Sequence, residues 1–275
     1  MPPTLRSIGN VLSFDEVLRR LAQQDVVDGL VVLGSAAGNA LNLASDYDLY
    51  LVLSAMPAPI HVGLTWIDGR LTDLVFEHAS AVDRYLEQED PLPTDAGQER
   101  LTRYVTTGRI VVDRHARLER VHHKIGNAQG FKPLDESAIY RIWFGVNYNL
   151  QQTKRMLASD DPVYARAIDI RLLYSTAEIM LAYFQMRRLP WRGEKEAIRY
   201  FTNNDPGFLR VFEEYADAND RAAKVQAYEQ LAAQALAPLG GVWPDGVTVM
   251  QLEGPDSSSE TAERVLAFWE ELLTT

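Results

Sequence analysis

The chain has 275 residues, no cysteine and a formal net charge of −11, from 27 Lys and Arg against 38 Asp and Glu. Its apolar fraction of 47% and charged fraction of 24% are typical of a folded globular protein, which excludes a mainly disordered chain. The absence of cysteine excludes a disulfide scaffold, a thiolate metal site and a cysteine nucleophile.

Net charge and hydropathy also limit the classes of binding partner and the cellular compartment that we expect. The acidic balance argues against broad nucleic-acid binding, which depends on clustered Lys and Arg. It is compatible with a cationic ligand, although a solvated surface is the ordinary explanation of such a charge. The first ten residues lack the order of a signal peptide, and no run reaches the ~18 apolar residues of a membrane span. We therefore expect a cytoplasmic protein with no membrane partner.

Residues 1–130 alternate short apolar runs with turn signals, which predicts a small mixed sheet with helices. A helix is expected after Ser13, because Ser13 and Glu16 fit a capping box. Strands are predicted at 29–33, 47–53, 61–67, 70–77 and 109–112. The Asp68-Gly69 pair between the third and fourth strands predicts a hairpin. Further helices are predicted at 80–88 and 96–106.

Residues 131–275 carry apolar side chains at helical spacing, with few Gly or Pro, which predicts an all-α bundle. The predicted helices span 135–158, 163–188, 194–202, 206–216, 221–237 and 260–273. The segment 240–259 is rich in Gly, Pro and Ser and is predicted to be a loop. The sequence thus predicts an α+β protein of two domains, residues 1–130 and 131–275, with a site in the cleft between them.

Three carboxylates of the first domain are the candidates for chemistry. Asp46 and Asp48 lie two residues apart on one predicted strand, so strand alternation places both side chains on the same face. Two carboxylates that close repel by about 4 kcal/mol at an effective dielectric of about 20, and a cation between them relieves this. Asp73 lies on a strand that can pair with theirs, and Mg²⁺ prefers such hard oxygen ligands.

Gly34 and Ser35 form a candidate phosphate site. They end the first predicted strand and precede a helical turn, where free backbone N–H groups and the serine hydroxyl can cradle a phosphate. The missing side chain at Gly34 lets a triphosphate approach the backbone closely.

Together these residues form an ordered pattern: Leu33-Gly34-Ser35, ten further residues, Asp46-Tyr47-Asp48-Leu49, and a later strand with Asp73. The pattern resembles the nucleotidyltransferase superfamily typified by DNA polymerase beta. The resemblance covers residues 26–77, and the run 34–49 is most similar to the small-molecule branch, which includes the aminoglycoside adenylyltransferases. In that branch a helical domain follows the catalytic domain, and the predicted architecture of this chain has the same order.

The resemblance implies a role for each matching residue. Gly34 and Ser35 would bind the triphosphate of an NTP, with ATP expected, and Asp46 and Asp48 would ligate Mg²⁺. Asp73 would be the third carboxylate, as a metal ligand or as the base for the acceptor hydroxyl.

Other positions complete or qualify that assignment. Glu77 lies on the same strand face as Asp73 and is the alternative third carboxylate. Lys195, near a helix start in the second domain, is either a phosphate ligand or a surface lysine. The sequence departs from the family in two places. Residues 36–39 lack the basic residue that many relatives carry, and Tyr47 stands where an aliphatic residue is usual.

The implied activity is Mg²⁺-dependent transfer of a nucleoside monophosphate from an NTP to a hydroxyl of a small molecule. A cationic, aminoglycoside-like acceptor is one candidate. Two alternatives stay open at this point. One is a toxin–antitoxin or regulatory nucleotidyltransferase that modifies a protein or a tRNA. The other is a nucleotide-binding module without turnover. The acceptor and the oligomeric state, a homodimer included, are left open by the sequence.

Overall fold

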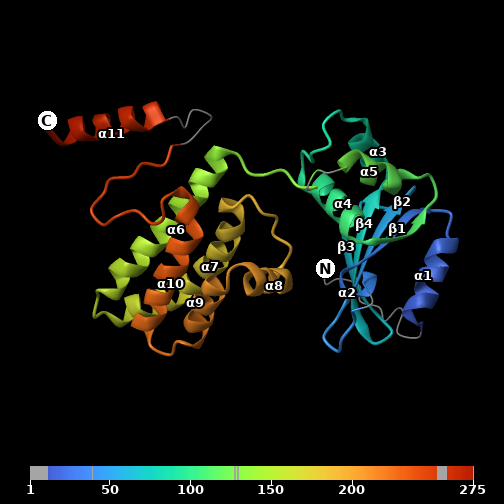
Figure 1. The fold of residues 1–275 in the computed structure, drawn as a ribbon, viewed down its shortest axis with the longest axis horizontal. Helices are drawn as coiled ribbons and strands as arrows, with labels where there is room; N and C mark the ends of the chain where they lie inside the picture. The colour runs from blue at the N-terminus through green and yellow to red at the C-terminus, as the bar shows by residue number, and fades with distance from the viewer. Residues whose placement is uncertain (1–11, 39, 127, 129, 253–258, 275) are drawn as a thin grey trace. The chain divides into compact units, whose positions relative to one another are not determined.

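The structure is a computed structural model that describes residues 12–38, 40–126, 128, 130–252 and 259–274. The chain divides into two compact units, Met1–Lys132 and Pro133–Thr275 (Figure 1). The first unit contains a five-stranded mixed sheet with helices and the second is helical, which confirms the predicted α+β class. Among the described residues, no helix combines the length and the apolar character needed to cross a membrane.

The sheet of the first unit has the strand order β3-β4-β2-β1-β5. Its strands are β1 (Val27–Leu33), β2 (Tyr47–Leu53), β3 (Val62–Ile67), β4 (Arg70–His78) and β5 (Arg109–Asp113). The β2–β4 pair is parallel, and the other neighbouring pairs are antiparallel. Asp68 and Gly69 join β3 to β4 with positive φ at both positions, as a tight type I′ hairpin turn requires. The predicted hairpin is therefore confirmed.

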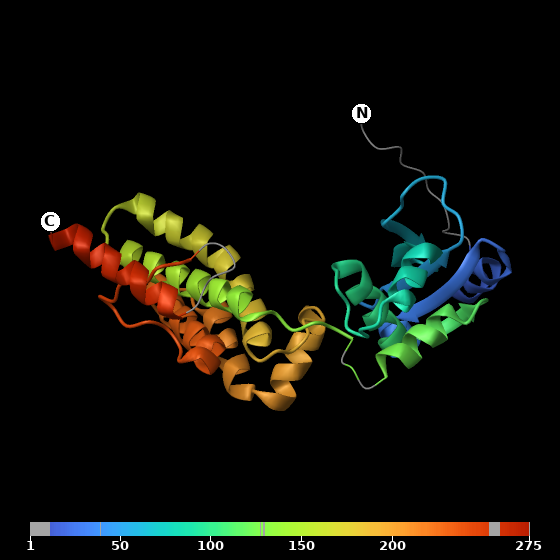
Figure 2. The ribbon, with the colours of Figure 1, turned by 90° about the horizontal axis from the view of Figure 1, so that it is seen from above.

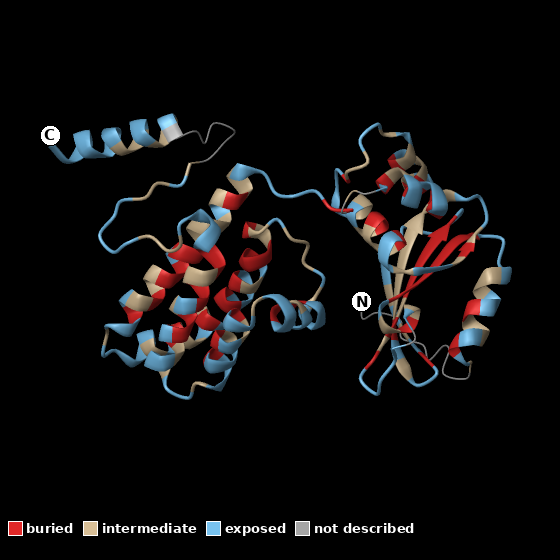
Figure 3. Cartoon of the chain, viewed as in Figure 1, coloured by how far each residue is buried: buried red, intermediate tan, exposed pale blue. Residues whose placement is uncertain are grey.

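Helices cover both faces of this sheet. α1 (Phe14–Gln23) packs on one face, together with Leu30 and Val32 of β1. Val31 and Leu33 point to the other face and pack with the remaining helices of the unit, α3 (Ala79–Glu87), α4 (Ala96–Thr107) and α5 (Arg117–Ile125). All seven residues of β1 are consequently buried (Figure 3).

The α5 helix is absent from the sequence prediction. Its buried residues Leu118, Val121 and Ile125 have helical spacing, but the positions between them are charged or histidine. It begins after Ala116, which has a φ of +52° and provides no side-chain cap. The cap comes instead from Asp113 of β5, whose carboxylate accepts the N–H groups of Leu118 and Glu119 at 3.2 and 2.9 Å. A start signal supplied from a strand has no local sequence signature.

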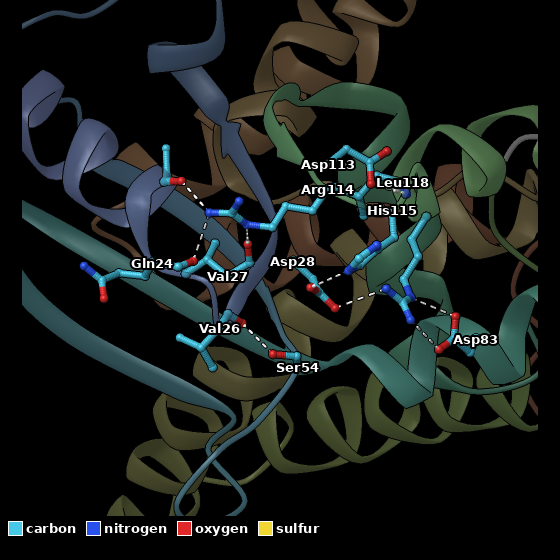
Figure 4. A network of polar contacts seen from close by, with 12 residues as sticks. Gln24, Val26, Val27, Asp28, Ser54, Asp83, Asp113, Arg114, His115 and Leu118 are labelled. Carbon is cyan, nitrogen blue, oxygen red and sulfur yellow. Dashed lines mark hydrogen bonds and ion pairs between the residues drawn. The ribbon is translucent and has the colours of Figure 1, made fainter.

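A polar network ties the start of β1 to the helices around it (Figure 4). Asp28 is buried, and its carboxylate lies 3.1 Å from Arg117 and 3.5 Å from His115. Arg117 also binds both carboxylate oxygens of Asp83 on α3, at 2.8 and 3.0 Å. Arg114 donates to the backbone carbonyls of Ala22, Gln24 and Val27. These contacts join α1, β1, α3 and α5 at the end of β1 opposite Gly34.

The Arg117–Asp83 pair predicts a pH dependence of stability. Hydrogen bonding from Arg117 lowers the pKa of Asp83. Because the folded-state pKa lies below the unfolded one, the pair stabilises the fold above about pH 4 and this contribution is lost as the pH falls through the lowered pKa. We expect Arg117→Gln to reduce the free energy of unfolding at neutral pH and to flatten its acid dependence. Urea unfolding at neutral pH and below about pH 4 measures both. Equal acid slopes for this variant and the exposed-site control Arg109→Gln would contradict the assignment.

The second unit is all-helical, as predicted. Its elements are α6 (Glu136–Leu157), α7 (Pro162–Met186), α8 (Glu194–Asn204), α9 (Pro206–Asp217), α10 (Arg221–Leu236), a 3₁₀ turn (Ala237–Leu239) and α11 (Ser259–Thr274). α6, α7 and α10 pack against one another (Figures 1 and 2). Aspartate side chains cap the starts of α6, α7, α9 and α10, which explains why these boundaries are readable in the sequence.

Candidate functional site

The sheet brings together three segments that are distant in the sequence. β1 ends at Leu33, whose partner across the antiparallel β1–β2 pair is Asp48. Asp48 is also the direct partner of Asp73 in the parallel β2–β4 pair. Adjacent strands lie about 4.8 Å apart and direct partners share a face, so the two aspartates are side-chain neighbours. The predicted pairing of the Asp73 strand with the Asp48 strand is confirmed.

Gly34 lies directly beside the Asp48 carboxylate. It begins α2 (Gly34–Ala37) with a φ of +58°, a conformation that favours glycine. A Cβ at this position would lie 2.8 Å from Oδ2 of Asp48, closer than carbon atoms normally approach. Glycine is therefore required for the backbone conformation and for the space beside the carboxylate. Its backbone is exposed, and Ser35 follows it at partial exposure.

Asp46 precedes β2 at the end of a turn that β4 holds in place. Ser45 is buried, and its hydroxyl accepts the N–H of Asn42 at 3.0 Å. Arg70, the first residue of β4, donates to the carbonyls of Asn42 and Ser45 at 2.6 and 2.8 Å. The loop that carries Asp46 is thus fastened to the strand that carries Asp73.

Removal of the Arg70 guanidinium should loosen the loop of residues 42–46 without unfolding the first unit. We expect Arg70→Gln to cost about 1 kcal/mol of stability, since its hydrogen bonds are only partly shielded from water. The backbone amides of residues 42–46 should lose protection in hydrogen exchange, whereas the amides of β1 should keep it. Arg70→Lys retains the charge and should show a smaller change. Unchanged protection at residues 42–46 in Arg70→Gln would show that Arg70 does not hold the loop.

The unusual aromatic residue between the two acids belongs to the core. Tyr47 points to the face of β2 opposite Asp48 and is only 4% exposed. Its ring stacks on Phe14 of α1, with ring centroids 3.8 Å apart. The departure from an aliphatic residue therefore changes the packing under α1 and leaves the carboxylate face unaltered.

Of the two candidates for the third carboxylate, Asp73 is the one beside Asp48. Glu77 lies on the same face of β4 but pairs with Val52, four residues further along the strand. At about 3.3 Å per residue, the two acidic residues are separated by about 13 Å along β4. Glu77 belongs instead to a separate cavity, described below.

Sequence reasoning missed an apolar strip that flanks the carboxylates. Leu64 of β3 is the direct partner of Asp73 and is 68% exposed. Val62 and Trp66 share its face, and both are also exposed. A strand that meets water on one face normally carries polar residues there. In β3 the alternate positions on that face are apolar, and this departure was the signal in the sequence. The carboxylate face thus offers apolar contact next to its charges.

The carboxylates of this face are hard-oxygen groups of the kind that Mg²⁺ prefers. Among the residues that the structure describes, no group of three or more His, Cys, Asp or Glu side chains is arranged to hold a metal by itself. Asp48 and Asp73 are nevertheless adjacent hard-oxygen donors. Mg²⁺ commonly binds through one or two carboxylates, waters and substrate phosphates. The arrangement suits that mode better than a resident, fully protein-ligated ion.

Lys195 lies in the second unit, in the first turn of α8. It is exposed and is flanked by Glu194 and Glu196. Its role as a phosphate ligand, and the position of the site between the two domains, stay predictions from the sequence.

Comparison with known proteins gives little beyond this geometry. No protein-family model matches the sequence, and no curated protein matches it at a significant level. Among solved structures, the chain is similar to a nucleotidyltransferase-like protein from Exiguobacterium sibiricum 255-15, at 11% identity and a TM-score of 0.34. The match covers 95% of this chain and 90% of that one. At this level of similarity the fold assignment depends on the strands and helices described above.

Proposed function

We propose that the protein is a Mg²⁺-dependent nucleotidyltransferase that moves a nucleoside monophosphate from an NTP to a hydroxyl group of a small molecule. One observation carries the proposal. The segments Gly34-Ser35, Asp46-Tyr47-Asp48 and Asp73, recognised in the sequence as an ordered pattern, meet at one end of the sheet with Gly34 against Asp48 and Asp48 against Asp73. A solvent-exposed strand whose acidic residues have no function does not require a glycine beside one of its carboxylates.

Each residue has a distinct task in this proposal. The exposed backbone at Gly34 and the hydroxyl of Ser35 bind phosphate oxygens of the NTP. Asp46 and Asp48 would ligate the metal together with waters and substrate phosphates, and Asp73 would approach the same ion or accept the proton of the attacking hydroxyl. When bound, Mg²⁺ would neutralise the triphosphate charge and orient the reacting oxygens. The pairing of Asp73 with Asp48 supports either role.

The acceptor is proposed to be small and cationic, with ATP as the nucleotide. The net charge of −11 favours a positively charged partner over a nucleic acid. The exposed apolar side chains Leu64 and Trp66 on the carboxylate face would contact a ring of the acceptor or of the nucleotide base.

The direct test is a transfer assay with ATP labelled at the α-phosphate, Mg²⁺ and a panel of amino-sugar, amino-alcohol and neutral polyol acceptors. Formation of a labelled adduct together with pyrophosphate, both abolished by EDTA, is the expected result. Label that appears on the protein itself would redirect the proposal to a protein target. Absence of pyrophosphate with every acceptor, despite Mg²⁺-dependent ATP binding, would contradict turnover.

One observation favours a second function, a nucleotide-binding module without turnover. The described residues contain no ready-made group of three metal ligands. Such a module would bind NTP without completing the metal site. A thermal-shift series with several NTPs, each with and without Mg²⁺, separates the two. Stabilisation that does not depend on Mg²⁺ supports the binding module, and stabilisation that requires Mg²⁺ supports the transferase.

A further inference from the structure

A second polar cavity lies in the first unit, between β4, α3 and α4. Its volume is about 200 Å³. The polar or charged side chains in its wall are those of Glu77, Arg84, Asp95, Gln98 and Arg100. Glu77 is about 13 Å along β4 from Asp73, so this cavity is distinct from the carboxylate pair.

Groups of opposite charge converge at one point of the cavity wall. A Cβ placed on Gly97 would lie 3.1 Å from Oδ1 of Asp95, 3.8 Å from Nη2 of Arg100 and 4.0 Å from Oε2 of Glu77. Two carboxylates and one guanidinium therefore lie within 4.0 Å of one position, which the missing side chain of Gly97 leaves open. The Oδ1 of Asp95 also accepts the N–H of Gln98 at 2.9 Å, as the cap of α4. A ligand group placed there meets both signs of charge at once.

The arginines of this cavity have few partners in the part of the chain that the structure describes. Within that part, neither the Arg84 nor the Arg100 guanidinium forms a hydrogen bond or an ion pair, and the Nε of Arg100 is buried. The hydroxyl of Tyr50, which lies near Arg100 and Glu77, is also buried without a partner. The Glu77 carboxylate accepts the N–H of its neighbour His78 at 3.2 Å. Tyr50 is not part of the cavity wall, so the binding capacity of the wall lies in the Arg84 and Arg100 guanidinium groups.

We propose that this cavity binds a small zwitterion of the α-amino-acid class. The ligand ammonium group lies between Glu77 and Asp95, and the ligand carboxylate binds the guanidinium of Arg100, the side chain best suited to a planar carboxylate. The two acids and two arginines of the wall cancel, which matches a ligand with both charges and no net charge. A cavity of about 200 Å³ is below the size of most drug-sized sites and suits one small molecule.

The site does not depend on the proposed transfer reaction, and its test uses binding alone. The full-length protein is titrated by calorimetry with the standard amino acids, and with ethanolamine, lactate and glycerol as controls. Ethanolamine carries only the amine, lactate only the carboxylate, and glycerol neither charge. We expect saturable binding of at least one amino acid and binding at least about tenfold weaker for each control, because each lacks a charged hydrogen-bonding group. Equal binding of glycerol or of a single-charge control would overturn the proposal, as would the absence of binding by every amino acid.

Variants locate the binding. Arg100→Gln and Glu77→Gln should each weaken the amino acid at least about tenfold, whereas the exposed-site control Arg109→Gln should not. Circular dichroism confirms that each variant is folded, and Arg100→Lys retains the charge if the glutamine variant is unstable. Unchanged affinity in the folded Arg100 and Glu77 variants would place the ligand elsewhere and overturn the assignment. Absence of transfer activity in the unaltered protein, with amino-acid binding that these variants weaken, would contradict the proposed function and leave this site standing.

Discussion

Replacement of Asp48 by asparagine should reduce nucleotidyl transfer by about a thousandfold or more and leave the protein folded. Asp48 is the central residue of the site, because it contacts Gly34 and is the strand partner of Asp73. In the proposed function, loss of its charge removes a ligand of the metal, and a bound metal contributes several kcal/mol of transition-state stabilisation. Asp48 is only partly buried and asparagine has nearly the same shape, so the variant should remain folded.

The combination of lost activity and preserved stability is the diagnostic result. Asp68→Asn is the matched control, because it removes the same charge from the same sheet at a turn with a φ of 51°, where asparagine is well tolerated. Transfer rate, Mg²⁺-dependent ATP binding by calorimetry and thermal unfolding are measured for both variants. Mg²⁺-dependent binding that survives in Asp48→Asn, or equal losses in the two variants, would contradict the metal assignment.

Replacement of Gly34 by alanine should damage the same site through space rather than charge. The backbone at φ +58° costs an alanine about 1 kcal/mol. The new Cβ would also lie 2.8 Å from Oδ2 of Asp48, so the carboxylate must move. A displacement of about 1 Å at a catalytic group can reduce the rate about a hundredfold. We therefore expect a modest loss of stability and a large loss of transfer.

The hairpin provides the control that separates these two effects. Gly69 has a φ of +71°, and a Cβ placed there meets nothing within 4 Å. Gly69→Ala should thus incur the backbone cost alone, with transfer unchanged. Thermal unfolding and kcat are compared for the two alanine variants. Similar transfer rates would show that the contact between Gly34 and Asp48 is unimportant for the reaction.

Local sequence signals predicted the elements of this protein well where the stabilising interactions are themselves local. The Asp68-Gly69 pair makes the hairpin because both residues tolerate positive φ. Ser13 caps α1 as predicted, through the N–H of Glu16 at 3.3 Å. The second half of the capping box differs, since the Glu16 carboxylate binds Arg19 and Arg20 instead. A four-residue motif does not include the arginines that compete for the Glu16 carboxylate, so it could not predict this difference.

The site shows the same division between local pattern and tertiary arrangement. The sequence by itself determined the chain order of Gly34-Ser35, Asp48 and Asp73 and their placement on predicted strands. It left Asp73 and Glu77 as alternatives, because both occupy the same face of one strand. The parallel register of β2 and β4 pairs Asp48 with Asp73 and places Glu77 opposite Val52, which favours Asp73 as the proposed third carboxylate. Register depends on the packing of a whole sheet, which residue spacing does not encode.

Features built from distant segments were decided only by the tertiary structure. The α5 helix takes its cap from Asp113 on the preceding strand, and the second cavity gathers Glu77, Asp95 and Arg100 from β4, a loop and α4. In the sequence these are scattered charged residues without a motif. Their proximity follows from the burial of β1 and β2 beneath helices on both faces, which fixes where each surface side chain emerges. That packing involves many side chains at once, and so the length, composition and charge of the chain could bound the function but not locate this cavity.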